Sequence, residues 1–133
     1  MIYLVKKIQL RLVDLGLMQN QRLGTSQLNK EWLNMTSLIP QNLLNRIPKL
    51  YETEEQTDPI AYVKLFLDGW TWFITEISID NNICFGYVIS PFESELGYFS
   101  LKEIKGIKGT LGIGVERDLS FKPIKLSIIK KAS

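Results

Sequence analysis

The side chains of this sequence that could perform acid–base or metal chemistry are carboxylates. The candidates are Glu76, Glu95, Glu116 and Asp118. Carboxylates that converge in a fold can act as general acid and general base, or they can bind magnesium. No pair of these four lies within a recognised catalytic or metal-binding motif. We therefore expect no catalytic residues, no metal site and no cofactor, and a protein that is not an enzyme.

The residue types that are missing exclude several further classes of site. The chain contains no histidine and one cysteine, Cys84. Without histidine it cannot form a histidine-based catalytic triad, the common zinc sites or an imidazole pH switch. One cysteine supports neither a thiolate zinc site nor a disulfide framework. A single cysteine inside an apolar strand is typical of a reducing compartment, so we expect a cytoplasmic protein.

Two tryptophans are candidates for binding. Trp70 and Trp72 are separated by one residue on a predicted strand, so their side chains project from the same face. Such a pair can stack nucleic-acid bases or anchor a protein interface, or it can pack beneath a helix. Packing is the favoured interpretation, and of the two we expect Trp70, beside the turn, to be the one that is partly exposed. Strict alternation along the strand places Glu76 on the same face as Trp72.

The elements that position these residues form a predicted β-meander between Ala61 and Ser100. The strands are expected at residues 61–67, 71–79, 83–89 and 96–99. Asp68-Gly69 and Asp80-Asn81-Asn82 supply the turns between the first three strands. Both faces of the predicted sheet carry large apolar groups, so we expect a helix to pack on one side. Gly86 predicts a place where another backbone or ring comes close.

The flanking segments are predicted to cover this sheet. The expected helices are Met1–Leu15, for which a strand is the competing alternative, and Ser26–Leu33, Pro40–Ile47 and Leu101 to about Lys105. Ser100 and Glu103 match a capping box for the last of these. A polar, acidic connection is expected at Tyr51–Pro59, a last strand at Leu119–Phe121, and either a short helix or an edge strand at Ile124–Lys131.

These elements together predict the α+β class. We expect an antiparallel β-meander of about four to five strands covered by short helices. Residues 1–34 form a helical N-terminal extension, and residues 35–133 form a single domain. Charged residues interrupt the apolar N-terminal stretch, so we expect neither a membrane-spanning helix nor a signal peptide.

Charge is distributed unevenly along the chain. The net charge is +2, but residues 1–50 carry +5, residues 51–100 carry −8 and residues 101–133 carry +5. One interpretation, the favoured one, is that these segments neutralise one another in the fold. The other is that an acidic sheet surface is offered to a basic partner. Arg117, between two acidic residues, is expected to form structural ion pairs, and the C-terminal lysines are expected to be solvated.

Four motifs carry a resemblance to a known family. They are Gly69-Trp70-Thr71-Trp72, Phe85-Gly86-Tyr87-Val88, Glu95-Leu96-Gly97-Tyr98-Phe99-Ser100 and Glu116-Arg117-Asp118-Leu119-Ser120-Phe121-Lys122-Pro123. In order and rough spacing they resemble an uncharacterised small bacterial domain that is common on plasmids, phages and other mobile elements. The resemblance covers about residues 35–128, and residues 1–34 depart from the pattern. It implies no accepted catalytic residues. Some relatives are described as inhibitors of RNA-guided CRISPR nucleases, so the resemblance implies an anti-CRISPR-like protein.

The expected function is therefore that of a small, non-enzymatic interaction protein of mobile-element type. It would bind a basic, nucleic-acid-handling protein such as a CRISPR nuclease through its acidic and aromatic meander. The candidate partner-binding residues are Trp70, Trp72, Glu76, Glu95, Tyr98, Glu116, Arg117 and Asp118. The alternative is a module that binds single-stranded nucleic acid through the aromatic sheet and its basic flanks.

Overall fold

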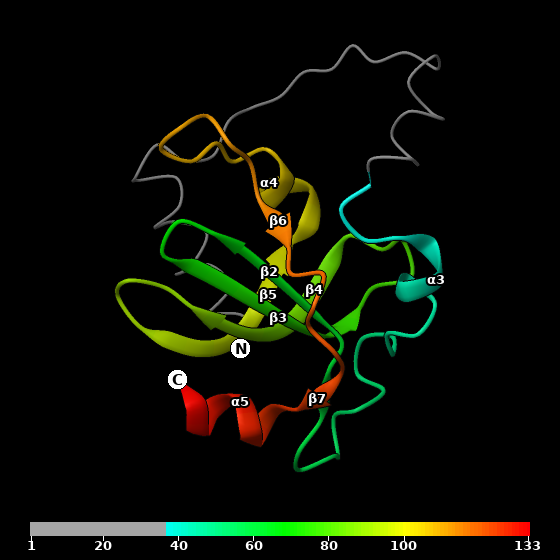
Figure 1. Cartoon of the computed structure of the whole chain (residues 1–133). Coiled ribbons are helices and arrows are strands. Elements are labelled where there is room, and N and C mark those ends of the chain that lie inside the picture. Colours follow the sequence, from blue (N-terminus) through cyan, green and yellow to red (C-terminus); the bar gives the residue numbers. More distant parts are fainter. Residues whose placement is uncertain (1–36) are drawn as a thin grey trace.

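A five-stranded antiparallel sheet dominates the computed structural model, which describes residues 37–133 (Figure 1). Its strand order is β5-β4-β3-β2-β6. The bounds are β2 Val63–Leu67, β3 Trp70–Ile77, β4 Ile83–Ile89, β5 Ser94–Ser100 and β6 Glu116–Arg117. Strands β2 to β5 follow one another as hairpins, which confirms the predicted meander. The predicted helical extension, residues 1–34, lies outside the described residues.

Short elements surround this sheet. A second, two-stranded sheet pairs β1 (Ile60–Ala61) with β7 (Ile124–Lys125). The helices are α3 (Gln41–Leu44), α4 (Leu101–Lys105) and α5 (Leu126–Ala132). The part of the chain that the structure describes is thus mostly antiparallel sheet with a few short helices. No helix within residues 37–133 is long and apolar enough to cross a membrane.

The two hairpin turns form where their residue types predict them. Leu67 pairs with Trp70 across the two-residue loop, in which Asp68 has φ 52°. Asn81, in the turn between β3 and β4, has φ 59°. Aspartate and asparagine tolerate this left-handed region better than other non-glycine residues. Both predicted turns are confirmed.

A β-bulge at Thr75 changes which face the end of β3 presents. Ile74 pairs with Gly86 and Glu76 pairs with Phe85, so Thr75 is an extra residue opposite β4. A bulge shifts the alternation of side chains by one position. The simple alternation of β3 therefore ends at Ile74, and the prediction that Glu76 shares a face with Trp72 is wrong. Glu76 projects from the opposite face.

The face that carries Trp72, called the inner face here, holds the larger core. Trp72 and Ile74 are fully buried there, beneath Leu101 and Ile104 of α4. The Ser100 hydroxyl caps α4 by accepting the Glu103 N–H at 3.2 Å, which confirms the predicted capping residue. Ile39 and Ile47, which flank α3, are buried in this core, and Leu43 and Leu44 of α3 pack against it. The two short helices α3 and α4 therefore cover the inner face.

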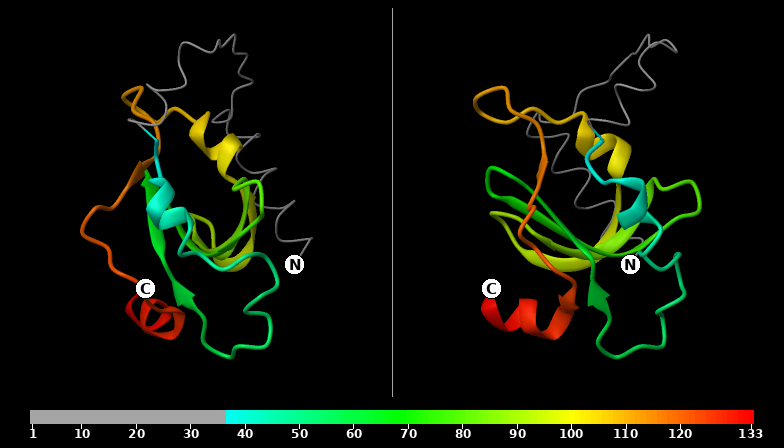
Figure 2. Two further views of the ribbon diagram at one scale, coloured as in Figure 1. Left: turned by 90° about the vertical axis from the view of Figure 1, so that its right-hand side faces the viewer. Right: turned by 45° about the vertical axis from the view of Figure 1, so that its right-hand side comes forward.

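The opposite, outer face of the sheet has a second, smaller core. Phe73 of β3 packs with Ala61 and with Leu126 and Ile129 of α5. Figure 2 shows α4 and α5 on opposite sides of the sheet. Helices therefore cover both faces, rather than one as predicted, and the part of the outer face that α5 leaves open becomes available for a site.

At Gly86 the backbone of β3 leaves no room for a side chain on β4. A Cβ atom at this position would lie 1.7 Å from the carbonyl oxygen of Phe73. Any side chain would displace one strand of the sheet. The predicted close backbone approach is confirmed.

Some predicted boundaries are wrong. The predicted helix Pro40–Ile47 is limited to Gln41–Leu44, and Pro40 precedes it in an extended conformation. The predicted strand Leu119–Phe121 does not form. The strand is Glu116–Arg117, and the chain then turns because the Asp118 carboxylate accepts hydrogen bonds from Ser120. The last segment, residues 124–131, begins as β7 and continues as α5, so both alternatives hold for parts of it.

Candidate functional site

The two candidate tryptophans belong to the inner core. Trp70 is 4% exposed and Trp72 is 0% exposed, and their rings stack with centroids 5.9 Å apart. Packing is thus confirmed, and the expected exposure of Trp70 is wrong. Neither indole ring is accessible for stacking on a base or for contact with a partner.

The four candidate carboxylates do not converge. Glu76 projects from the outer face of the central strand β3, whereas Glu95 pairs with Val88 and lies on the inner face of edge strand β5. Glu116 and Asp118 lie in and after β6, at the other edge. Among residues 37–133, no group of three or more acidic or cysteine side chains is arranged to hold a metal ion. These four residues do not form one acid–base or magnesium site.

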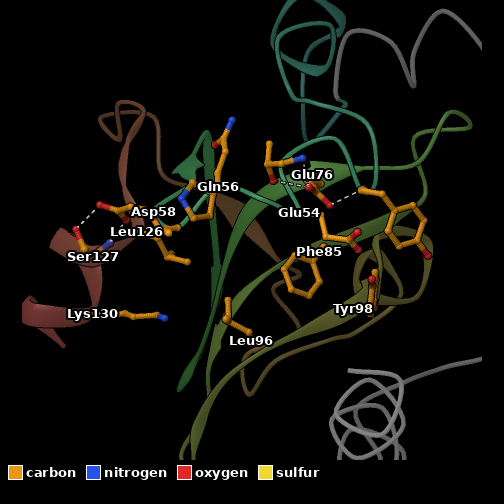
Figure 3. Close-up of a pocket in the computed structure, with 14 residues that line it drawn as sticks. Glu54, Gln56, Asp58, Glu76, Phe85, Leu96, Tyr98, Leu126, Ser127 and Lys130 are labelled. Carbon is orange, nitrogen blue, oxygen red and sulfur yellow. Dashed lines mark hydrogen bonds between the residues drawn. The ribbon is translucent and has the colours of Figure 1, made fainter.

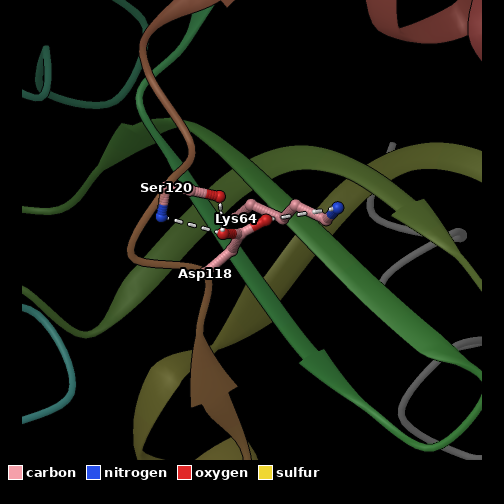
Figure 4. A network of polar contacts seen from close by, with 3 residues as sticks. All are labelled: Lys64, Asp118 and Ser120. Atoms are coloured by element: carbon pink, nitrogen blue, oxygen red, sulfur yellow. Dashed lines mark hydrogen bonds and ion pairs between the residues drawn. The ribbon is translucent and has the colours of Figure 1, made fainter.

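The Glu116-Arg117-Asp118 triplet has a structural role. Arg117 Nε donates a hydrogen bond of 2.9 Å to the carbonyl oxygen of Leu38, and the predicted ion pairs of Arg117 do not form within residues 37–133. Asp118 accepts hydrogen bonds from the Ser120 hydroxyl and N–H and lies 3.5 Å from Lys64 Nζ (Figure 4). The Ser120 hydrogen bonds and the lysine charge lower the pKa of Asp118 below its usual value. These contacts hold β6 and the following turn against β2.

Glu76 and Tyr98 are two predicted site residues that the fold brings together on the outer face. Glu76 pairs with Phe85, and Phe85 pairs with Tyr98, so the three side chains form a row on the outer face. They line a pocket of about 290 Å³ (Figure 3). Residues 51–59, called the acidic connection here, form one wall, and Leu126, Ser127 and Lys130 of α5 form the other.

Glu76 holds the acidic connection against the sheet. Its Oε1 accepts the Tyr51 N–H at 2.9 Å, and its Oε2 accepts the Thr53 N–H at 2.8 Å and the Thr53 hydroxyl. Only 4% of Glu76 is exposed. Hydrogen bonds to an ionised acceptor are stronger than those between neutral groups. This one carboxylate therefore fixes the start of the connection.

Asp58 fixes the other end of the connection to α5. Its carboxylate accepts the Ser127 N–H at 2.9 Å and the Ser127 hydroxyl at 2.7 Å. These hydrogen bonds, together with the charges of Lys125 and Lys130, lower the pKa of Asp58. The acidic connection is thus attached at both ends, and the exposed Glu52, Glu54 and Glu55 lie between the attachments.

Aromatic rings and carboxylates meet at the β3 end of the pocket. The Tyr98 ring lies 4.8 Å from Phe85 and 6.5 Å from Tyr51, measured between ring centroids. Burial raises the pKa of Tyr98 to about 12, and the Tyr51 hydroxyl and the charges of Glu76 and Glu54 add to the shift. Glu76, Glu54 and Tyr98 therefore lie together at this end of the pocket.

Sequence reasoning missed most of this pocket. Tyr51, Thr53 and Phe85 were not candidates, and Lys130 was considered as a phosphate contact or, preferably, as a solvated lysine, but not as part of a pocket. Residues 51–59 carry no local signal for a site beyond their acidity. The alternation of β3 also pointed Glu76 to the wrong face, because nothing in the sequence marks the bulge at Thr75.

Comparison with known proteins places most of the chain in a family. A family model built from proteins of unknown function matches residues 35–132. No curated protein and no solved structure shows significant similarity to the chain.

Proposed function

The chain belongs to the family of proteins of unknown function DUF2958, and we propose that it is a small, non-enzymatic interaction protein that binds a basic surface of a partner protein. The observation that carries this proposal is the fixed acidic connection. Its backbone is held by Glu76 at one end and by Asp58 at the other. The three exposed glutamates between them are presented without a large entropic cost of ordering on binding.

The negative charge of the acidic connection is not neutralised by ion pairs within residues 37–133. The ion pair between Lys64 and Asp118 lies outside the acidic connection. Glu52, Glu54 and Glu55 form no ion pair with a lysine or arginine of this region. An exposed, uncompensated charge cluster favours association with the opposite charge and accelerates it.

The class of partner follows from its required charge. Proteins that handle nucleic acid line their channels with lysine and arginine, which bind phosphates. A rigid acidic surface can occupy such a channel in place of the phosphates. The resemblance of the four motifs to a domain found on plasmids and phages supports the finer proposal, an inhibitor of an RNA-guided nuclease of anti-CRISPR type.

The test uses the full chain, with a partner captured from host extract, identified and then purified. The variant E52K/E54K/E55K reverses the acidic connection, and K102E/K105E/K108E reverses an equal number of exposed lysines in and after α4. We expect the first variant to bind at least about tenfold more weakly and the second to bind as well as the original chain. Equal affinity of the original chain and the acidic variant would overturn the proposal.

The nucleic-acid alternative has its own measurement. The full chain is titrated into a labelled single-stranded oligonucleotide at several salt concentrations. The proposal expects no binding at micromolar protein. Binding that weakens steeply with salt would favour direct contact with phosphates and overturn the proposal.

A further inference from the structure

The pocket on the outer face has two chemically different ends (Figure 3). One lies against α5 and contains Asp58, Ser127 and Lys130. The other, called the acid–aromatic end here, contains Glu54 and Glu76 together with the rings of Phe85 and Tyr98. Among residues 37–133, a basic side chain lines the α5 end but not the acid–aromatic end.

The α5 end is internally satisfied. Asp58 accepts two hydrogen bonds from Ser127. The Lys130 ammonium lies 5.6 Å from the centre of the Tyr87 ring and near the Asp58 charge. Each charge at this end thus already faces a complementary group.

The acid–aromatic end carries negative charge without a counter-charge. Glu76 is 4% exposed and accepts three hydrogen bonds, yet no lysine or arginine of residues 37–133 pairs with it. Buried charges in proteins are generally paired, because an isolated charge loses its hydration. The exposed Glu54 adds a second carboxylate at the rim of the same pocket. A cation at this end would neutralise both.

The walls suit a cation with an apolar stem. The rings of Phe85 and Tyr98, whose centroids lie 4.8 Å apart at a tilt of 55°, and the ring of Tyr51 have faces of negative potential that attract cations. Leu96 provides an apolar contact between the two ends. The volume of about 290 Å³ lies at the lower limit of pockets for drug-sized ligands, which begin at about 300 Å³. It fits one long side chain.

We propose that the acid–aromatic end is a receptor for the guanidinium group of one arginine side chain of the basic partner. This inference rests on the proposed function and identifies the partner side chain that the pocket would bind. A guanidinium stacks on aromatic rings, is more weakly hydrated than an ammonium and donates two parallel hydrogen bonds to a carboxylate. Lysine offers only a compact, strongly hydrated charge. Arginine is therefore the preferred occupant.

The test titrates the full chain with a blocked Gly-Arg-Gly peptide, observed through the backbone amide signals by NMR. We expect saturable shifts at Tyr51, Thr53, Glu54, Phe85 and Tyr98. The same peptide with citrulline, which keeps the shape but not the charge, should bind at least about tenfold more weakly. Absence of shifts at the pocket amides would overturn the inference.

Two glutamate variants separate the pocket from general electrostatics. Glu54→Gln removes a carboxylate that lines the pocket, and Glu55→Gln removes its exposed neighbour, which does not. Both residues are exposed, so neither change should unfold the domain. We expect only Glu54→Gln to weaken peptide binding, by about tenfold. An equal loss for both variants would overturn the inference.

Two further measurements distinguish a failure of the arginine receptor from a failure of the proposed function. If Glu54→Gln binds the purified partner unchanged while E52K/E54K/E55K does not, the arginine receptor is wrong and the proposed function stands. If peptide binding is as expected but no variant affects partner binding, the proposed function is wrong. Tighter binding of spermidine than of the peptide would overturn the assignment to a protein side chain.

Discussion

Thr53 and Glu76, 23 residues apart in the chain, are joined by two hydrogen bonds, from the Thr53 N–H at 2.8 Å and from its hydroxyl. Through this contact a carboxylate on the central strand holds a surface turn against the sheet. Pro48 and Leu50 support it, because their backbone groups exchange hydrogen bonds with Ile77 at the end of β3. The acidic surface thus depends on one buried carboxylate.

Glu76→Gln should destabilise the domain. The amide nitrogen of glutamine would face an N–H donor of Tyr51 or Thr53, and the remaining hydrogen bonds would lose their charge. We expect the free energy of unfolding to fall by about 2–3 kcal/mol. Urea unfolding followed by tryptophan fluorescence measures this.

Glu95→Gln is the matched control for that variant. Glu95 Oε2 is buried without a hydrogen-bond partner among the described residues. Loss of its charge should therefore change stability by no more than about 0.5 kcal/mol, or should stabilise the domain. Equal losses for the two variants would contradict the role assigned to Glu76.

Gly86→Ala should disrupt the centre of the sheet. Its Cβ would lie 1.7 Å from a backbone oxygen of β3, so the strands must separate. We expect a loss of at least about 2 kcal/mol in thermal or urea unfolding. At Gly114 the nearest atom would be 3.6 Å away, an ordinary contact, so Gly114→Ala should be nearly neutral. A neutral Gly86→Ala would show that the strand spacing is wrong.

Acid should release α5 from the acidic connection. The Ser127 hydrogen bonds lower the pKa of Asp58 from its ordinary value of 3.8. A group whose pKa is depressed by folding stabilises the fold above the unfolded value, and this contribution is lost as the pH falls through the folded value. The loss should therefore occur below about pH 3.8. Hydrogen exchange or NMR shifts of the Ser127 amide, measured against pH, report it.

Asp58→Asn and Glu55→Gln test the assignment of that transition. Asparagine cannot titrate, so the Ser127 amide should lose its acid transition in Asp58→Asn. Glu55 is exposed and forms no hydrogen bond or ion pair with α5, so Glu55→Gln should keep the original profile. Persistence of the transition in Asp58→Asn would assign it to another group, of which Asp80 and Asp118 are candidates with lowered pKa values.

Cys84 should be chemically inert in the folded protein. Its side chain is fully buried between the sheet and the inner core, and burial raises the pKa of the thiol far above its usual value. The thiolate is the reactive form. We expect Ellman's reagent to react with Cys84 only after unfolding in urea, whereas an exposed thiol introduced by Ser133→Cys should react at once. Rapid reaction of the native chain would contradict this burial.

Local signals account for the parts of the fold that sequence predicted well. The turn residues Asp68 and Asn81, the strand bounds Ile83–Ile89 and the cap at Ser100 depend on residues within a few positions of one another. The close approach at Gly86 was also predicted, because a glycine inside a strand often marks a position where another backbone comes close.

The amino-acid sequence by itself determined the meander, its turns and the packing of Trp72 beneath a helix, because backbone preferences and side-chain alternation act over short distances. The pocket was decided only by the tertiary structure. The bulge at Thr75 turned Glu76 to the outer face, and hydrogen bonds spanning 23 to 69 residues brought the acidic connection over it. Such contacts depend on which surfaces remain uncovered once the sheet and its helices have packed, and no local pattern records that.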